Sequence, residues 1–170
     1  MMLDEAEDDH EAAAPLDMLE RYYTAHGWPC ERHEDEISAT VKGSWTEYEV
    51  RALWREEDSV LQFLCFPDVK VAEERRAPIH EALTLVNEQL WVGHFELWSS
   101  SGILLYRHAM VIDGDEDGER LMSLGATELL VETAIDECER FYPVFQFVLW
   151  GGKTPREAIA AALIETQGEA

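Results

Sequence analysis

The sequence has few cysteines, and their spacing excludes two classes of small folded protein. Cys30, Cys65 and Cys138 are the three cysteines among 170 residues, and no Cys-x-x-Cys pair occurs. Neither a zinc knuckle nor a disulfide framework is therefore predicted. We expect buried, reduced thiols, with a reactive thiol as the alternative.

Basic residues are also scarce. Thirteen Lys and Arg face 36 Asp and Glu, so the formal net charge is −23. Nucleic-acid binding depends on basic side chains that neutralise phosphates, and a negative field also opposes adsorption to anionic membranes. The composition thus indicates neither a nucleic-acid nor a membrane partner. The field would attract basic proteins; the alternative is that it only keeps the chain dissolved.

Long apolar segments are missing too. No apolar run reaches the roughly 20 residues of a membrane span, and residues 1–5 lack the basic and apolar regions of a signal peptide. We therefore expect a cytoplasmic protein. Residues 1–14 are acidic and Ala-rich with nothing to bury, so a disordered tail is predicted there. Residues 15–170 suit a single domain.

Two periodicities run through this domain and predict an α+β fold. Apolar residues recur at helical spacing over 15–26, 78–91, 119–141 and 155–166. Pro143 should kink or restart the chain after the third helix. Alternating or continuous apolar runs predict strands at 30–33, 37–42, 45–55, 60–66, 95–99 and 103–112. Because the connections are short, we expect an antiparallel sheet with the helices packed on one side.

The run from 141 to 150 is the most apolar part of the chain, with Gln146 as its single strongly polar residue. One helix cannot hide so many large side chains behind a single stripe. The run is therefore predicted to be mostly buried, with part of it at a homodimer contact, the commonest oligomer symmetry. The candidate interface residues are Phe141, Phe145, Phe147 and Trp150.

Glu128, Glu132 and Asp136 follow one another at a spacing of four residues on the third helix. Like charges at this spacing repel each other weakly. The ridge is either a solvated helix face or the docking site of a basic protein partner.

Metal chemistry has two weak candidates. If Ser99 faces Ile103 across a three-residue loop, His94 faces His108 beside Glu96, and the pair could ligate a metal or simply satisfy each other. The acids at 113, 115 and 117 with Gly118 resemble the start of an EF-hand, but Leu124 occupies the position that requires Glu. No nucleotide-binding or catalytic motif occurs. We expect no metal, no cofactor and no catalytic residue.

Three segments resemble a known family. Residues 91–95 (Trp-Val-Gly-His-Phe), 106–108 (Tyr-Arg-His) and above all 138–153, from Cys-Glu-Arg-Phe-Tyr-Pro to Trp-Gly-Gly-Lys, are similar to the YbjN family of small bacterial sensory transduction regulators. The resemblance covers about residues 15–168. It implies a fold like that of type III secretion chaperones, often paired as a dimer, and it implies no enzymatic activity.

These observations favour a non-enzymatic, cytoplasmic binding or regulatory module. It would act as a chaperone-like adaptor in bacterial signalling or stress regulation, binding a protein segment along the sheet edge or in an apolar groove. The alternative is a small-molecule or metal-sensing domain centred on His94 and His108, and an enzyme ranks third.

The charge balance generates a first prediction. Without the six acids of residues 1–14, thirty acidic residues still face thirteen basic ones, so the folded part itself should repel phosphates. A filter-binding assay at physiological salt is expected to show no retention of duplex DNA or structured RNA. Sub-micromolar retention of either would contradict the interpretation.

Overall fold

The computed structural model describes residues 12–168 and confirms the α+β prediction. Its elements along the chain are α2 (Pro15–Ala25), β1 (Cys30–Arg32), β2 (Glu36–Lys42), β3 (Glu47–Arg55), the 3-10 turn η1 (Glu56–Asp58), β4 (Val60–Phe66), the 3-10 turn η2 (Glu73–Arg75), α3 (Arg76–Asn87), β5 (His94–Leu97), β6 (Leu104–Val111), α4 (Leu124–Leu149) and α5 (Pro155–Gly168).

The six strands form one sheet in the order β1-β2-β3-β4-β6-β5, with every neighbouring pair antiparallel. Alternation decides which side chains face the helices. On β3, Tyr48, Val50 and Ala52 are buried beneath them, whereas Glu49 and Arg51 project from the other face. The nearly continuous apolar run of β4 lies between β3 and β6, as its composition predicts for a central strand.

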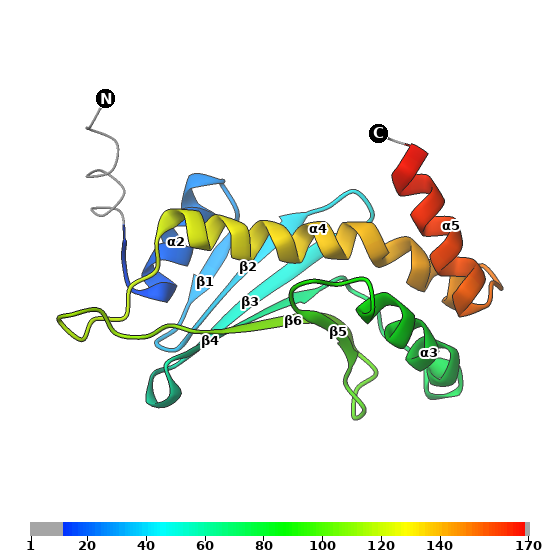
Figure 1. The fold of residues 1–170 in the computed structure, drawn as a ribbon, viewed down its shortest axis with the longest axis horizontal. Helices are drawn as coiled ribbons and strands as arrows, with labels where there is room; N and C mark the ends of the chain where they lie inside the picture. The colour runs from blue at the N-terminus through cyan, green and yellow to red at the C-terminus, as the bar shows by residue number, and fades with distance from the viewer. Residues whose placement is uncertain (1–11, 169–170) are drawn as a thin grey trace.

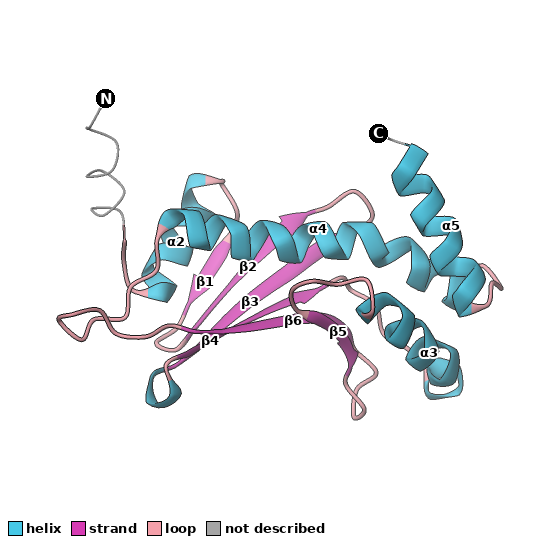
Figure 2. Cartoon of the chain, viewed as in Figure 1, coloured by secondary structure: helices cyan, strands magenta, loops and turns pink. Residues whose placement is uncertain are grey.

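The helices cover one face of this sheet (Figures 1 and 2). α4 runs the length of the sheet, with α2 beside its first half, and α3 and α5 pack around its last turns. The reciprocal bonds of a capping box begin α5: Glu157 N donates to Thr154 Oγ1 and Thr154 N to Glu157 Oε2, both at 3.2 Å. The opposite face of the sheet carries no helix among residues 12–168.

Three predicted boundaries change in the structure. The third helix begins at Leu124 rather than 119, because the Ser123 hydroxyl caps it by accepting from Ala126 N at 3.1 Å. Pro143 neither ends nor restarts the helix, which continues to Leu149. Residues 1–11 of the predicted tail lie outside the described residues, but Ala13 is buried and pairs with Met122, so the ordered chain begins before residue 15.

A contact from the β2–β3 turn explains how α4 passes Pro143. Proline has no N–H for the carbonyl four residues earlier, which is that of Glu139. The indole N–H of Trp45 donates to this carbonyl at 3.0 Å, and the Ser44 N–H donates to the Glu139 carboxylate at 2.7 Å. The Trp45 ring stacks on Tyr142 with an interplanar angle of 11°. The turn thus replaces the helical bond that Pro143 removes.

This replacement generates a prediction about stability. Trp45→Phe keeps an aromatic ring on Tyr142 but leaves the Glu139 carbonyl without its donor at a solvent-exposed position, at a cost of about 0.5–1.5 kcal/mol. At a chain of this length, the melting temperature should fall by roughly 2–4 °C for each kcal/mol. Calorimetry measures the change.

A double-mutant cycle supplies the control. Pro143→Ala restores a helical N–H to Glu139, so Trp45→Phe should cost less in that background. Equal costs in both backgrounds would show that the indole bond does not compensate for the proline.

Candidate functional site

The apolar run 141–150 is mostly buried, as predicted, but by the chain itself. Phe141 and Phe145 are fully buried and contact the Phe95 ring edge-on or tilted, at 6.1 and 5.5 Å between centroids. α3, α5 and the 43–46 turn cover the sides of α4 that the sheet does not reach. Phe141 and Phe145 are therefore wrong as interface candidates, because they offer no surface. Phe147 is half-buried, and Trp150 is 66% exposed.

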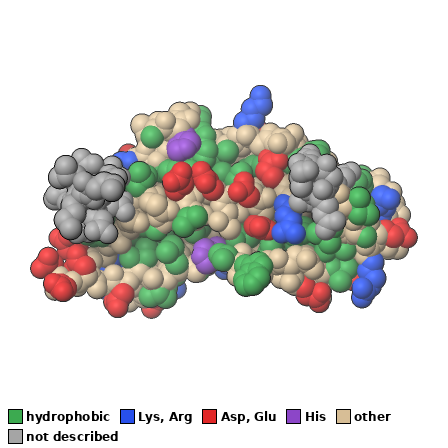
Figure 3. Space-filling model, turned by 45° about the horizontal axis from the view of Figure 1, so that its top comes forward, with side chains coloured by type: hydrophobic (Ala, Val, Ile, Leu, Met, Phe, Trp, Pro, Cys, Tyr) green, Lys and Arg blue, Asp and Glu red, His purple; other side chains and the backbone are tan. Residues whose placement is uncertain are grey.

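Glu128, Glu132 and Asp136 are all exposed on α4. Figure 3 shows acidic side chains in a row along this helix, with exposed apolar side chains on the flank beside them. Burial raises the pKa of Tyr22 on α2 to about 12, and Glu132 and Glu128 contribute to this rise. The first part of the ridge therefore lies toward α2. Burial, followed by repulsion from Glu139, raises the pKa of Asp136 above its ordinary value.

The predicted pairing of His94 with His108 is wrong by one residue. His94 pairs with Arg107, because the hairpin loop holds four residues, 99–102, rather than three. A slip of one residue moves a side chain to the other face of a sheet. His94 consequently lies on the open face and His108 beneath α4. Within residues 12–168, no group of three or more His, Cys, Asp and Glu side chains could hold a metal ion.

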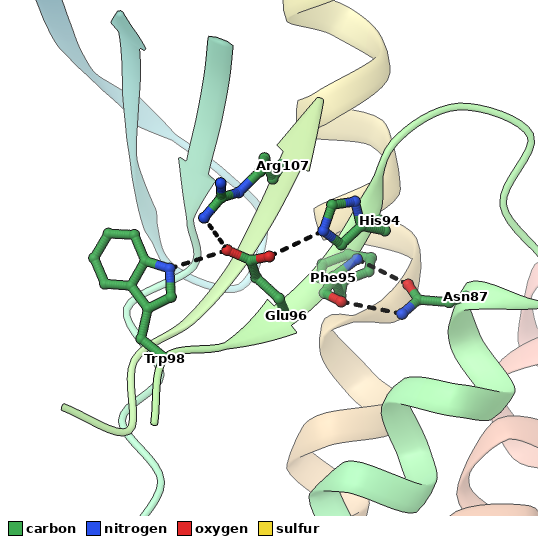
Figure 4. A network of polar contacts seen from close by, with 6 residues as sticks. All are labelled: Asn87, His94, Phe95, Glu96, Trp98 and Arg107. Carbon is green, nitrogen blue, oxygen red and sulfur yellow. Dashed lines mark hydrogen bonds and ion pairs between the residues drawn. The ribbon is translucent and has the colours of Figure 1, made fainter. Parts of the chain in front are cut away.

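Glu96 on β5 organises a polar network on the open face (Figure 4). Its carboxylate accepts hydrogen bonds from His94 Nε2 at 2.9 Å, Trp98 Nε1 at 3.0 Å and the Arg107 guanidinium. Partial burial pushes the pKa of Glu96 upward, but these three donors outweigh it and hold the pKa below its ordinary value. The network fixes a charged side chain on the sheet rather than exposing a reactive one.

Asn87 at the end of α3 closes the outer edge of β5. Its side-chain amide donates to the Phe95 carbonyl at 3.0 Å, and its oxygen accepts from the Phe95 N–H at 2.8 Å. These are the two backbone groups that point away from β6, so they are unavailable to an added strand. The β5 edge is therefore blocked at its centre.

The second half of β6 has a free edge instead. β5 begins at His94, opposite Arg107, while β6 continues to Val111. Backbone groups of alternate residues point to the same side of a strand. Those of Ala109 and Val111 therefore point, like those of Arg107, toward the β5 side, where no strand pairs with them within residues 12–168.

Gly93 explains why β5 begins only at His94 and does not pair with the last residues of β6. Its φ is +71°, and a Cβ at this position would lie 2.2 Å from the Tyr106 hydroxyl oxygen. That hydroxyl donates to the Val92 carbonyl at 2.7 Å. The close approach requires glycine and turns the chain away from β6.

A groove of about 340 Å³ lies next to the free edge, between β6 and α4. β6 contributes its floor and α4 one wall, and Val92 lies at one end. The lining residues are Val92, Tyr106, His108, Met110, Ala126, Leu129, Leu130 and Thr133. Leu129 is 69% exposed although it is apolar, and the neighbouring Trp91 is fully exposed. Such an exposed apolar surface is typical of a binding site.

Glu137 lies one helical turn beyond Thr133 and close enough to the groove residue Tyr106 to raise the phenol's pKa, after burial itself. Burial raises the pKa of Glu137 above its ordinary value, although Arg140 opposes this. Its Oε2 is buried and has no hydrogen-bond partner among residues 12–168; Arg140 Nη1 is 4.0 Å away.

The other candidate residues have structural roles. Cys65 and Cys138 are buried free thiols, as predicted, but Cys30 is exposed. In the 113–119 loop, Asp115 Oδ1 accepts from the backbone N–H of Asp117 and Glu119, at 2.9 and 2.8 Å. This carboxylate therefore closes its own turn.

Sequence reasoning missed the residues of the free edge and the groove, namely Ala109, Val111, Leu129 and Glu137. A signal was present in the unequal arms of the predicted hairpin. The strand predicted over 103–112 is twice as long as the one over 95–99, so part of it had to lack a hairpin partner.

The sequence also matches known proteins. A family model described as "YbjN: Putative bacterial sensory transduction regulator" matches residues 15–147. The chain belongs to the YbjN family. A solved structure described as "Crystal structure of YbjN, a putative transcription regulator from E. coli" is similar, with a TM-score of 0.51 and 9% identity over 73% of this chain and 85% of that chain. At this identity the similarity shows the fold alone. No curated protein matches the sequence.

Membership of the YbjN family confirms the resemblance that the sequence motifs indicate, and the family is described as a regulator rather than an enzyme. The likeness to secretion chaperones stays a prediction. No helix within residues 12–168 is long and apolar enough to span a membrane.

The position of His108 generates a prediction about pH. Burial lowers its pKa below the ordinary value, so the unfolded chain takes up a proton at a higher pH than the folded chain. Stability should therefore fall as the pH decreases from about 6.5 toward the folded-state pKa. His108→Gln cannot titrate, so its stability should fall less steeply over this window, by no more than the slope of one proton. Urea unfolding at a series of pH values measures both slopes, and identical slopes would contradict the expectation.

Proposed function

We propose that this YbjN-family protein is a non-enzymatic regulatory module that binds an extended, basic segment of a partner protein along the free end of β6. The single observation that carries the proposal is the free edge at Ala109 and Val111 beside the groove of Leu129 and Met110. The family description supports a regulatory role and says nothing of a partner.

The free edge supplies the main-chain part of recognition. A segment that adds to β6 would donate to and accept from the outward backbone groups of Ala109 and Val111, as in other cases of strand addition. The β5 edge cannot do this at Phe95, because Asn87 occupies both groups there. The segment would thus add at one end of β6.

The groove supplies side-chain selectivity. Alternate side chains of an added strand project toward α4, where they would meet Met110, Leu129 and Val92. These positions favour apolar residues on that face of the segment. A volume of about 340 Å³ lies at the lower end of the range for ligand pockets, so it accommodates a few side chains rather than a folded domain.

Charge favours a basic segment. Glu128, Glu132 and Asp136 form the exposed ridge of α4. Complementary charges mainly accelerate and select encounters, so binding should weaken as salt increases. A role as a chaperone-like adaptor is the narrower form of this proposal and rests on fold likeness alone.

The metal-sensing alternative has lost its geometric basis. It required His94 and His108 to lie together, and they lie on opposite faces of the sheet. We therefore carry one candidate function forward.

The test uses a fluorescein-labelled synthetic peptide in which valine alternates with lysine, measured by fluorescence anisotropy. Ala109→Pro removes an outward N–H, and Leu129→Asp places a charge in the groove. Each should weaken binding by about tenfold, the effect of roughly 1.4 kcal/mol. Hydrogen exchange at the amides of Ala109 and Val111 should slow when the peptide binds.

Matched controls separate the groove from the overall charge. Ala109→Val keeps the N–H, and Ile164→Asp changes an equally exposed residue, 70% against 69%, on α5. Both should bind as the wild type does. Equal binding by all four variants, or by a peptide of serine alternating with lysine, would show that the net charge alone holds the peptide and would refute the proposal.

A further inference from the structure

A second groove lies on the other flank of α4, between this helix and α2 (Figure 1). Its volume is about 410 Å³, which is within the range of small-molecule pockets. Residues of α2 form one wall, and residues at the start of α4 form the other. The grooves on the two flanks of α4 share no lining residue.

Helical spacing explains which side chains border this second groove. Met18, Arg21 and Ala25 are three and four residues apart, so they lie on one face of α2. Leu124 and Glu128 are four residues apart in the first turns of α4 and project together from the other wall. Ala25 carries only a methyl group, which leaves space beside the Arg21 side chain.

The floor of this groove is apolar. Met18 and Tyr22 are buried there, and Leu124 is partly exposed on the wall. The His26 ring lies against the Tyr22 ring, with 4.1 Å between centroids. His26 Nδ1 donates to the Tyr22 carbonyl at 2.8 Å, which leaves Nε2 of the neutral ring as an acceptor. The groove thus offers apolar surface together with a neutral acceptor.

Arg21 and Glu128 place opposite charges on the two walls. Both side chains are exposed, and within residues 12–168 neither forms an ion pair or a side-chain hydrogen bond. Other charged side chains of α2 are paired, because Arg32 contacts both Asp17 and Glu20. Packed helices are typically about 8–10 Å apart. One small ligand that carries both charges could therefore reach both walls.

We propose that this groove binds a free α-amino acid with an apolar side chain. The ligand's carboxylate would pair with the Arg21 guanidinium, whose planar fork suits a carboxylate. Its ammonium group would donate to the Glu128 carboxylate and to His26 Nε2. Its side chain would lie on Met18 and Leu124. A ligand with a single charge would leave one wall unpaired, so both charges are required.

This site goes beyond the proposed function and does not depend on it. The partner segment would occupy the β6 flank of α4, whereas the amino acid would occupy the α2 flank. Arg21 belongs to the α2 groove alone, so its substitution affects one site and leaves the other intact.

Three probes test the proposal by amide NMR of the isotope-labelled protein. L-Leucine carries both charges, N-acetyl-L-leucine lacks the ammonium group and L-leucinamide lacks the carboxylate. L-Leucine should shift the amides of Ala25 and Gly125, with a Kd of about 0.1–1 mM for so small a ligand. Each of the other two probes should bind about tenfold more weakly, the effect of roughly 1.4 kcal/mol.

Two variants match these probes. Arg21→Gln should weaken the binding of L-leucine about tenfold without further weakening that of L-leucinamide, which has no carboxylate for the arginine. Glu128→Gln should weaken L-leucine without further weakening N-acetyl-L-leucine, which has no ammonium group. Arg156→Gln changes another exposed arginine, on α5, and should bind L-leucine as the wild type does. The amide spectrum of each variant shows whether it is folded.

L-Leucine that shifts neither amide well above this concentration range would refute the proposal. Equal binding of the three probes, or binding that both matched variants leave unchanged, would show that the paired charges recognise nothing and would equally refute it. Shifts confined to Ala109 and Val111 would place the ligand at β6 and contradict the assigned site. The valine–lysine peptide should bind Arg21→Gln no more weakly than the wild type, so the two proposals can fail separately.

Discussion

The bond between the Trp45 indole and the Glu139 carbonyl is the contact on which the architecture depends. Without it, Pro143 would leave a carbonyl unpaired in the middle of the chain's longest helix. With it, α4 continues for 26 residues, about 39 Å at 1.5 Å per residue. One helix of that length can cover a face of the sheet from end to end.

Because α4 covers only one face of the sheet, the opposite face and the edges of the sheet remain open. The edges of a sheet invite pairing with other chains, and proteins usually shorten or cap them. Here β1 has only three residues and β5 is capped by Asn87. The end of β6 is neither shortened nor capped, because the turn at Gly93 takes the chain away from it. This uncapped end of β6, next to the capped strand β5, suits the strand addition proposed for it.

The sequence predicted the elements that local periodicity determines. It missed the features that depend on loop length or on contacts between residues far apart in the chain. Alternating or continuous apolar runs located the six strands found within residues 12–168, and helical spacing located α5, because each signal lies within a few neighbouring residues. The register of the β5–β6 hairpin depends on whether its loop contains three residues or four, and the pattern allows both. The helical continuation through Pro143 required a donor from Trp45, far earlier in the chain, which no local pattern reveals. Burial of the 141–150 run was predictable, but its cover by α3 and α5 was not. The small alanines of α5 do not indicate from sequence how closely this helix packs against α4.

The two faces of the sheet also show why net charge alone says little about association. At physiological salt the screening length is about 8 Å, which is shorter than either surface. A docking chain therefore responds to the charges beside it rather than to the total of −23. On the ridge of α4 those charges are nearly all negative, which would favour the basic segment proposed above. On the open face Arg51 and Arg107 are already paired with Glu49 and Glu96, so the local field is close to neutral. The charges close to a docking chain, rather than the net charge, therefore decide which face of the sheet suits the basic segment proposed above.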